Sequence, residues 1–293
     1  MRLTIPEEEL ITPGHKGCQG CGGALAMRYA LKALGDKTIV VIPACCWTVF
    51  EGEFPYTCMR VPLLHTAFET AASASAGIRA ALKAKGRDDV TVMAWAGDGG
   101  TFDIGLQALS GAVERNEDFF YVCYDNEGYM NTGIQRSSST PYGAWTTTTP
   151  VESFESGHKK NIVEIMVAHD IPYAATASIA YPEDLIRKMT KAKNIKGSKF
   201  IHILAPCSPG WRFPTNQTIK MARLAVETYI FPLYEVENGK YTISRKPKKK
   251  LVREYLEMQG RFRHLSDEII NAIQAKVDSD WEKLLKKEEI TKG

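Results

Sequence analysis

The feature that most limits what this chain can fold into is a pair of apolar segments, each leading directly into a turn rich in glycine and side-chain oxygen. Residues 90–95 (Val-Thr-Val-Met-Ala-Trp) predict a buried strand. The turn at 96–101 (Ala-Gly-Asp-Gly-Gly-Thr) follows, and apolar residues then recur with helical spacing over 104–113. Residues 119–124 (Phe-Phe-Tyr-Val-Cys-Tyr) predict a second strand, which the turn at 125–133 follows. In a parallel sheet both turns lie at the carboxyl edge, where open α/β sheets bind ligands. The sequence therefore predicts an α/β fold around a mostly parallel sheet.

The two turns carry oxygen ligands that suit a magnesium ion and a diphosphate. Asp98 offers an anionic oxygen, Asn126 a neutral one and a backbone carbonyl near Gly128 a third, which leaves octahedral positions for phosphate oxygens and water. A glycine-rich turn between a strand and a helix also presents N–H groups to phosphate. One Gly-Asp-Gly turn is a weak signal, but here a partner that also ends a strand follows after the 26 residues 100–125. A G-x-G-x-x-G run after the first strand is absent, which disfavours a dinucleotide.

The spacing of these turns resembles the diphosphate-binding motif of thiamine diphosphate enzymes. The runs over 96–110 and 124–137 closely resemble the β subunit of pyruvate:ferredoxin oxidoreductase (pyruvate synthase), in the 2-oxoacid:ferredoxin oxidoreductase family, and the similarity covers roughly residues 10–265. One departure is Glu127, which replaces the second Asn of the general thiamine pattern. The oxidoreductase branch tolerates it, because its third protein ligand comes from the backbone two residues after the first Asn. The resemblance implies the diphosphate-binding domain of the thiamine fold, with helices on both faces of the sheet. The residues implied for the diphosphate and Mg²⁺ are Gly97, Asp98, Gly99, Gly100, Asn126 and Gly128.

The cysteines point to a metal site without identifying it. Seven cysteines with uneven spacing argue against a secreted disulfide framework. The pair Cys18 and Cys21 fits half of a zinc site, a redox dithiol or half of an iron–sulfur site. Zinc and [4Fe–4S] sites both take four ligands. Cys207 follows a strand expected at 200–205, so it reaches the same sheet edge as the cofactor, as does Cys46.

The resemblance chooses among these metal sites. The related β subunits hold one [4Fe–4S] cluster with a Cys-x-x-Cys pair, a cysteine about 25 residues later and one far downstream. Cys45 is then a neighbour of the cluster, and Cys58 and Cys123 are expected to be packed thiols. The cysteines that correspond to the cluster ligands are Cys18, Cys21, Cys46 and Cys207.

The long segment after the second turn is a candidate cover for the active site. Residues 132–150 are polar and show neither helical nor strand period, and a loop of this length is usually functional or disordered. Its aromatic and glycine residues favour an ordered cover. Asn131 matches the family's Asn near the 2-oxo acid and is the predicted catalytic residue, with capping of its own turn as the alternative. Within 59–86, His65 and Glu69 are expected to share one helical face. Their roles stay open, because the family's catalytic Glu comes from the partner subunit.

The resemblance also implies a reaction. Pyruvate, CoA and oxidised ferredoxin give acetyl-CoA, carbon dioxide and reduced ferredoxin, reversibly, with thiamine diphosphate, Mg²⁺ and one [4Fe–4S] cluster as cofactors. The chain has neither a two-cluster Cys-x-x-Cys-x-x-Cys-x-x-x-Cys run nor an evident second α/β domain. Sister subunits are therefore predicted to supply a two-cluster ferredoxin-like domain and the pyrimidine-binding domain. The alternatives are a sister enzyme for branched-chain 2-oxo acids, 2-oxoglutarate or oxalate, and a non-redox assembly subunit whose cysteines hold zinc. A thiamine decarboxylase without redox function would leave the four cysteines unexplained.

Composition and patterning complete the expectations. A net charge of +3 gives no case for nucleic acid, no apolar segment reaches membrane-spanning length, and residues 1–10 are acidic and lack a signal core. We therefore expect a cytoplasmic protein. The thiamine diphosphate- and cluster-binding domain is expected over 1–232. A peripheral arm over 233–293 is expected to hold a hairpin around Asn238-Gly239 and an amphipathic helix from Ser266. Further strands are expected at 38–42, 59–62, 173–178 and 200–205, and further helices at 24–34, 162–168, 182–193 and from Thr215 to Tyr229.

Overall fold

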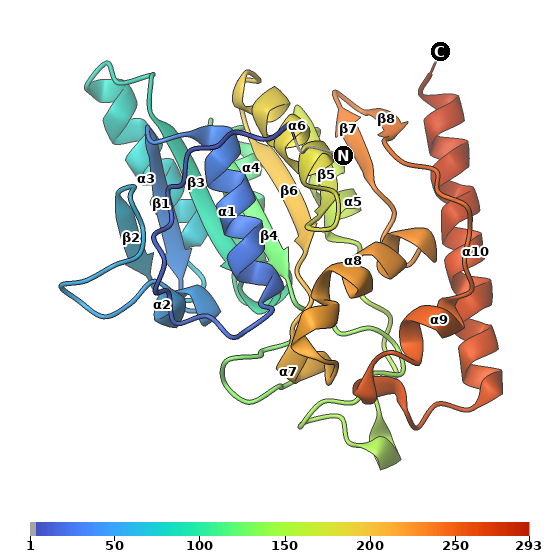
Figure 1. Ribbon diagram of the computed structural model, residues 1–293. Coiled ribbons are helices and arrows are strands. Elements are labelled where there is room, and N and C mark those ends of the chain that lie inside the picture. The colour runs from blue at the N-terminus through green and yellow to red at the C-terminus, as the bar shows by residue number, and fades with distance from the viewer. Residues whose placement is uncertain (1–3, 293) are drawn as a thin grey trace.

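In the computed structural model, which describes residues 4–292, the chain folds around one eight-stranded β-sheet. The strands are β1 (Thr38–Pro43), β2 (Leu63–Thr66), β3 (Thr91–Gly97), β4 (Phe120–Asp125), β5 (Tyr173–Ser178), β6 (Lys199–Leu204), β7 (Tyr234–Glu237) and β8 (Lys240–Ile243). They lie in the order β2-β1-β3-β4-β6-β5-β7-β8 (Figure 1). Strands β1 to β6 are mutually parallel, whereas β7 and β8 are antiparallel to their neighbours. The predicted α/β fold with a mostly parallel sheet is confirmed.

Helices cover both faces of the sheet, as predicted. The helices are α1 (Gly22–Leu34), α2 (Cys46–Phe50), α3 (Ala71–Ala84), α4 (Leu106–Glu114), α5 (Ile162–Val167), α6 (Pro182–Lys193), α7 (Ser208–Trp211), α8 (Thr218–Glu227), α9 (Val252–Leu256) and α10 (Asp267–Ile290). Shorter helical turns are η1 (Gly99–Asp103), η2 (Val151–Ser153), η3 (Thr215–Gln217) and η4 (Gly260–Phe262). Helices α1 and α6 pack on one face, and α3, α4 and α5 pack on the other (Figure 1).

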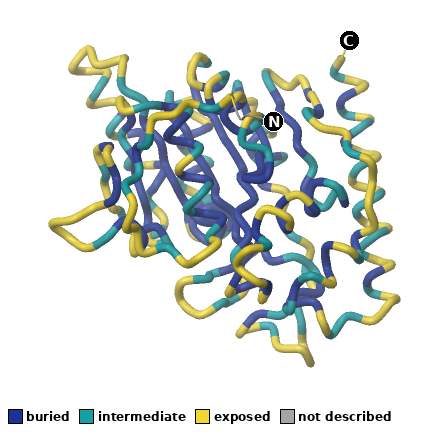
Figure 2. Tube along the Cα trace, viewed as in Figure 1, coloured by how far each residue is buried: buried dark blue, intermediate teal, exposed yellow. Residues whose placement is uncertain are grey.

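The alternation of side chains along the central strands creates a core on each face. In β3, Met93 and Trp95 belong to the core under α1 and α6, whereas Val92 and Ala94 belong to the core under α3 and α4. All four side chains are buried, and Figure 2 shows the central strands as the most buried part of the molecule. A strand covered on both faces needs apolar residues at nearly every position, which explains the continuous apolar run at 90–95.

Several predicted element boundaries are confirmed, and each has a local cause. Gly35 ends α1 with a φ of 82°, and its N–H donates to the Leu31 carbonyl oxygen at 2.8 Å. Pro182 begins α6, where its missing N–H costs nothing. Asn238 and Gly239, with φ values of 48° and 78°, connect β7 to β8 in a tight hairpin.

The strand predicted at residues 59–62 is wrong. The extended segment that enters the sheet is β2, which begins at Leu63 because that residue pairs with Val40 of β1. Met59 instead forms an isolated bridge with Ile11 near the chain's start. The β2 strand is at the edge of the sheet. Both stretches are short and mix apolar with polar residues, so pairing with β1 decides which one becomes the strand.

The helical face predicted for His65 and Glu69 is also wrong. His65 lies in β2, and α3 begins only at Ala71, so the two side chains belong to different elements. The Nε2 atom of His65 lies 2.9 Å from Glu51 Oε1. This contact ties β2 to the end of α2. The other predicted elements begin and end within three residues of their expected positions.

The C-terminal arm, residues 233–292 in the structure, extends the same sheet. Strand β7 pairs with β5, and β8 pairs with β7. Helix α10 runs along this edge of the molecule and packs against β8 and α9 (Figure 1). Ile270 and Leu284 of its apolar stripe are buried, and Trp281 stacks on Tyr229 with ring centroids 4.0 Å apart. The predicted amphipathic helix therefore packs on its own chain. None of the helices within residues 4–292 combines the length and apolar character needed to cross a membrane.

Candidate active site

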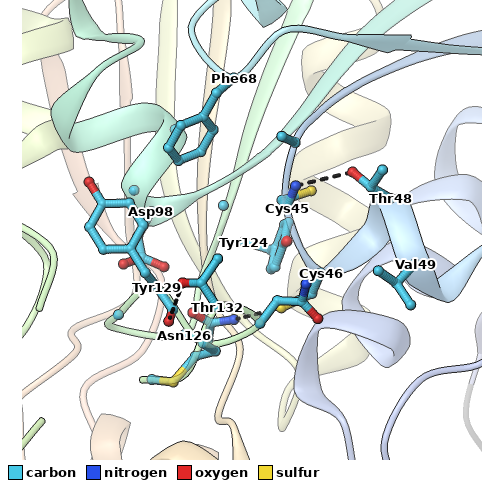
Figure 3. A pocket seen from close by; sticks show the side chains of 17 residues that line it. Cys45, Cys46, Thr48, Val49, Phe68, Asp98, Tyr124, Asn126, Tyr129 and Thr132 are labelled. Carbon is cyan, nitrogen blue, oxygen red and sulfur yellow. Dashed lines mark hydrogen bonds between the residues drawn. The ribbon is translucent and has the colours of Figure 1, made fainter. Parts of the chain in front are cut away.

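A cavity of about 330 Å³ opens at the carboxyl edge of the sheet, beyond the ends of β1, β3 and β4. Figure 3 shows Asp98, Asn126 and Tyr129 on one side of it and Cys45 and Cys46 on the other. The structure thus brings both predicted turns to one cavity. The predicted diphosphate and metal residues that line it are Gly97, Asp98, Gly99, Gly100, Asn126 and Gly128, and the predicted catalytic Asn131 lines it too.

Asp98, Asn126 and Gly128 bring polar atoms together at one point. One terminal atom of the Asn126 amide lies 2.9 Å from the Gly128 carbonyl oxygen and 3.0 Å from Asp98 Oδ1. If the amide nitrogen occupies this position, it donates a hydrogen bond to the Gly128 carbonyl oxygen and to Asp98 Oδ1. If the amide oxygen occupies it, three oxygen atoms meet at one point. Oxygens about 3 Å apart correspond to adjacent corners of an octahedron around Mg²⁺, whose bonds to oxygen are about 2.0–2.1 Å long. The donor set therefore fits a hard divalent cation.

The environment of Asp98 also suits a cation. Its side chain is buried, and Ser137 Oγ donates a hydrogen bond to Asp98 Oδ2 at 2.5 Å. Burial, together with the nearby charge of Asp125, raises the pKa of Asp98 well above its ordinary value. A bound cation would lower this pKa again, because it favours the charged carboxylate. The surrounding side chains therefore compensate a negative charge on Asp98 only poorly.

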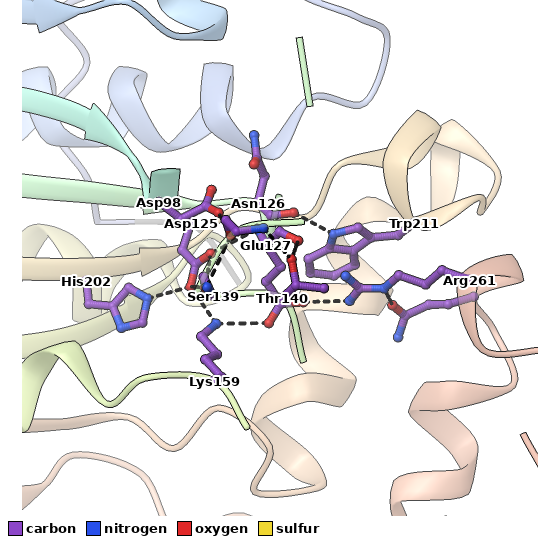
Figure 4. A network of polar contacts seen from close by, with 12 residues as sticks. Asp98, Asp125, Asn126, Glu127, Ser139, Thr140, Lys159, His202, Trp211 and Arg261 are labelled. Atoms are coloured by element: carbon purple, nitrogen blue, oxygen red, sulfur yellow. Dashed lines mark hydrogen bonds and ion pairs between the residues drawn. The ribbon is translucent and has the colours of Figure 1, made fainter. Parts of the chain in front are cut away.

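Asp125, by contrast, is surrounded by partners in a buried network (Figure 4). It accepts hydrogen bonds from Ser139 Oγ at 2.7 Å and from Lys159 Nζ at 2.5 Å, and His202 Nε2 lies 2.7 Å away. Burial alone would raise the pKa of Asp125, but Lys159 and His202 hold it below its ordinary value. Two neighbouring carboxyl groups thus differ in their environment: Asp125 supports the structure, and Asp98 faces the cavity.

Close packing explains the glycines of the first turn. A Cβ at Gly99 would lie 2.2 Å from the Tyr129 ring, and a Cβ at Gly100 would lie 3.3 Å from the Phe68 ring. Both rings line the cavity. The turn itself is the π-helical segment η1, which leads into α4. Such π turns are rare and recur at functional sites.

The segment after the second turn is an ordered loop, as predicted. Asn131, at its start, is exposed and lines the cavity. Residues 137–140 of this loop are buried, and Thr140 Oγ1 donates a hydrogen bond to the Glu127 carbonyl oxygen at 3.0 Å. The loop is therefore held from below by the same turn whose side chains line the cavity.

Three separate segments carry the predicted cluster ligands, and two of them are in direct contact. The glycine-rich loop 18–22 packs on the segment after β6: the Gly22 N–H donates to the Pro206 carbonyl oxygen at 3.1 Å. Thr218 Oγ1, at the start of α8, donates to the Gly20 carbonyl oxygen at 2.7 Å. These contacts place Cys18 and Cys21 beside Cys207, although Cys21 and Cys207 are 186 positions apart in the chain.

The thiols of these segments influence one another. Burial, reinforced by the neighbouring Cys18, raises the pKa of Cys21 to about 11 and that of Cys207 to about 12. Burial raises the pKa of Cys46 as well, and Cys45, Cys207 and Cys21 add to this effect. Thiols of this kind ionise when a metal binds them. Among residues 4–292, however, no three His, Cys, Asp or Glu side chains stand in a ready metal-binding arrangement, so the ligand set remains a prediction.

The other cysteines have simpler surroundings. Cys58 and Cys123 are buried, which confirms the prediction of packed thiols. Cys45 lines the cavity, and its N–H donates to Thr48 Oγ1 at 3.1 Å. All seven cysteines are free.

The network beneath the turns contains residues that the sequence did not suggest. His202 had a signal, since it is the polar residue in the otherwise apolar strand at 200–205. No sequence pattern pointed to Lys159 or Arg261. Arg261, for example, contacts Glu127 across 134 positions of the chain. The unforeseen residues around the site are Phe68, Lys159, His202, Trp211 and Arg261.

Known proteins share this sequence and fold. The family described as thiamine pyrophosphate enzyme, C-terminal TPP binding domain, matches residues 45–203. The ketoisovalerate oxidoreductase subunit VorB of Pyrococcus furiosus is 57% identical over 300 residues, which cover 99% of this chain and 96% of that protein. The pyruvate synthase subunit PorB of Methanothermobacter thermautotrophicus is 54% identical over 286 residues, covering 96% of this chain and 99% of that protein.

A solved structure supports the fold at lower sequence similarity. It is the 2-oxoglutarate:ferredoxin oxidoreductase from Magnetococcus marinus with 2-oxoglutarate, coenzyme A and succinyl-CoA bound. The match has a TM-score of 0.60 at 20% identity and covers 76% of this chain and 81% of that one. This likeness establishes the arrangement of strands and helices.

Proposed function

The chain belongs to the thiamine pyrophosphate enzymes, in the branch of the 2-oxoacid:ferredoxin oxidoreductase subunits, and on that premise we propose that it is the β subunit of a pyruvate:ferredoxin oxidoreductase. The observation that carries the proposal is the meeting of Asp98, Asn126 and Gly128 beside one cavity at the carboxyl edge of the sheet. In the proposed reaction pyruvate, CoA and oxidised ferredoxin give acetyl-CoA, carbon dioxide and reduced ferredoxin, and the reaction is reversible.

The two turns would hold thiamine diphosphate and Mg²⁺. The Asp98 carboxylate, the Asn126 amide oxygen and the Gly128 carbonyl oxygen are the proposed ligands of Mg²⁺, and residues 97–100 would face the diphosphate. Thiamine diphosphate bound there supplies the electron sink that decarboxylation of a 2-oxo acid requires. The chain's own contribution is to place the diphosphate and to balance its charge through the metal.

The cavity wall would bind the 2-oxo acid. Asn131 is exposed at the mouth, where its amide would donate a hydrogen bond to the substrate. Val49, Phe68 and Met130 give the wall an apolar surface, which limits water around the reacting carbon. Residues of a sister subunit would complete the pocket and bring the carboxylate expected at the pyrimidine end.

Electrons would leave through a [4Fe–4S] cluster on this chain. Four thiolates suit such a cluster, and loop 18–22 lies against the segment that carries Cys207. Cys46, which lines the cavity, is the proposed ligand nearest the cofactor. The partners proposed are sister subunits with the two-cluster ferredoxin-like domain and the pyrimidine-binding domain, and ferredoxin as the acceptor. The seven free cysteines suit a reducing compartment, and we place the complex in the cytoplasm.

A second substrate has specific support. The VorB relatives reach 56–57% identity, and the PorB relatives reach 46–54%. The difference in sequence identity between the two groups is small, and residues of other subunits would share in forming the pocket. A branched-chain 2-oxo acid such as 2-oxoisovalerate is therefore the second candidate, with the same cofactors and the same acceptor.

The test is an anaerobic assay of the native complex with CoA and a viologen dye. Pyruvate, 2-oxoisovalerate, 2-oxoglutarate and oxalate are compared at equal concentration. Preferential dye reduction with pyruvate supports the proposal, and reduction only with another acid replaces the substrate but keeps the cofactors. A colourless complex without iron, purified in the absence of air, would favour a zinc-binding assembly subunit instead of a redox enzyme.

A further inference from the structure

Arg261, in η4 of the C-terminal arm, reaches the underside of the second turn. Its side chain is buried, and its Nη2 donates to Glu127 Oε2 at 2.5 Å. Its Nε donates to Gln259 Oε1 at 2.9 Å. The Cζ atom of the guanidinium lies over the Trp211 ring, 4.1 Å from the ring centroid. Figure 4 shows Arg261 and Trp211 on one side of the network and His202 on the other, with Glu127 between them.

The two groups that Arg261 contacts are attached to the metal-binding turn. Trp211 Nε1 donates a hydrogen bond to the Asn126 carbonyl oxygen at 2.7 Å. Glu127 is the residue between Asn126 and Gly128, which both contribute to the cluster of polar atoms at the cavity. One guanidinium therefore fixes two adjacent residues of the turn, Asn126 through Trp211 and Glu127 directly.

The backbone of this turn requires such support. Glu127 has a φ of 64°, in the left-handed region that residues with a Cβ rarely adopt. Without external contacts, the turn would relax toward other backbone conformations, and the Asn126 amide and Gly128 carbonyl would separate. The contacts that hold Glu127 include Arg261 and Lys159 on its carboxylate and Thr140 on its carbonyl oxygen, and its N–H donates to Asp125 Oδ1 at 2.9 Å.

The charges around the turn also indicate that Arg261 supports it. The carboxylates of Asp125 and Glu127 face the cations Lys159 and Arg261 in one network, in which only Lys159 is partly exposed. The two cations face the two carboxylates within the network, whereas Asp98 is the carboxyl group turned toward the cavity. Loss of the Arg261 charge would leave Glu127 to share Lys159 with Asp125, next to the metal site.

We propose that Arg261 is a positioning residue of the cofactor site: through Glu127 and Trp211 it holds the Asn126 and Gly128 oxygens where Mg²⁺ binds. The inference rests on the proposed function, because it concerns the same metal. It also gives the C-terminal arm a role in the site, since Arg261 lies 134 positions beyond the Glu127 that it supports.

The test measures cofactor binding separately from activity. The full native complex is stripped of Mg²⁺ and thiamine diphosphate with a chelator, and the Kd of each is then measured by equilibrium dialysis at a saturating concentration of the other. Four variants are compared with the unmodified complex: Arg261→Met, Arg261→Lys, the double variant Glu127→Gln with Arg261→Met, and Lys246→Met. The last is the control, because Lys246 pairs with Glu288 in the same arm and away from the cavity.

Arg261→Met is expected to raise the Kd of Mg²⁺ by about 10- to 100-fold, the range typical of lost outer-sphere support. Arg261→Lys is expected to recover part of the loss, since lysine keeps the charge at Glu127 but cannot stack its plane on Trp211. The double variant is expected to bind no more weakly than Arg261→Met, because the two residues act as one unit. Lys246→Met is expected to bind as the unmodified complex does.

The outcomes separate the two proposals. If the unmodified complex binds no thiamine diphosphate with Mg²⁺, the proposed function itself fails, and the role of Arg261 fails with it. If the unmodified complex binds both and Arg261→Met binds them within twofold, only the positioning role is overturned. Should Arg261→Met fail to assemble, Arg261→Lys decides: a Kd raised at least threefold supports the role, and an unchanged Kd overturns it.

Discussion

Ser137 Oγ lies 2.5 Å from Asp98 Oδ2, so the loop that follows the second turn contacts the buried carboxyl group of the first. Ser137 also accepts a hydrogen bond from the Ser139 N–H at 3.1 Å, and Ser139 Oγ in turn donates to Asp125. Two serines, two positions apart, thus join the loop to the two carboxylates at the ends of β3 and β4. The loop and the metal-binding groups form one hydrogen-bonded unit.

The first prediction follows from this contact. Ser137→Ala removes the hydroxyl that orients Asp98 Oδ2 and is expected to weaken Mg²⁺ binding by about tenfold. The Kd of Mg²⁺ in the stripped complex, at saturating thiamine diphosphate, is the measurement. Ser198→Ala is the matched control, since the hydroxyl of this buried serine donates to the Glu117 carbonyl oxygen at the opposite edge of the sheet. Equal affinities in both variants would show that the Ser137 hydroxyl does not orient the carboxylate.

A second prediction concerns the glycines. Gly99→Ala puts a Cβ 2.2 Å from the Tyr129 ring and should destabilise the protein by about 1–3 kcal/mol through overpacking, with loss of cofactor binding. Gly77→Ala in α3 is the control, because no atom lies within 4 Å of its added Cβ, and it should stabilise the protein by about 0.5–1 kcal/mol. Denaturant unfolding of the full chain compares them. A Gly99→Ala protein as stable as the unmodified one would mean that Tyr129 moves aside freely.

The sheet and the two turns could be predicted from sequence because their signals are local. The apolar run at 90–95 and the Gly-Asp-Gly turn after it are neighbours in the chain, and the parallel sheet brings their counterparts to the same edge. The strand at 59–62 was misplaced, because two short apolar stretches compete and pairing with β1 selects the one that begins at Leu63. That choice depends on a contact between distant segments.

The residues that support the metal-binding turn could not be predicted either, because their contacts also join segments that are distant in the chain. Nothing near Glu127 indicates that it accepts a hydrogen bond from Arg261, and nothing near Arg261 indicates that it covers Trp211. The replacement of the expected Asn by Glu127 was visible in the sequence, but its consequence was not. A buried carboxylate in a left-handed turn requires cations, and only the folded chain shows where they come from.

A third prediction uses acid stability in the C-terminal arm. Glu288 accepts hydrogen bonds from the Ile243 N–H at 2.8 Å and from Lys246 Nζ at 2.6 Å. Burial opposes its ionisation, but these partners lower its pKa to about 2, from about 4.5 in the unfolded chain. A lowered pKa stabilises the folded state above the unfolded value, so this contribution is present above pH 4.5 and is lost as the pH falls toward 2. The free energy of unfolding of Glu288→Gln should therefore depend less on pH between about 4.5 and 2. Parallel curves for the variant and the unmodified chain would contradict this.

The last prediction separates the cluster from the thiamine site. Cys46→Ser removes one proposed cluster ligand while the ligands proposed for Mg²⁺ remain, so the complex should lose its dye reduction and about half or more of this chain's cluster iron, together with the matching part of its brown colour. The clusters proposed for the sister subunit keep their own colour. Its Kd for thiamine diphosphate should change less than about threefold, because none of the atoms proposed to bind Mg²⁺ comes from Cys46. Iron analysis, visible absorption and equilibrium dialysis on one anaerobic preparation give all three results. Cys58→Ala is the control, since that thiol is buried in the core and is expected to leave colour and iron unchanged. A Cys46→Ser complex that keeps its iron would remove Cys46 from the ligand set and direct attention to Cys45, its neighbour at the cavity.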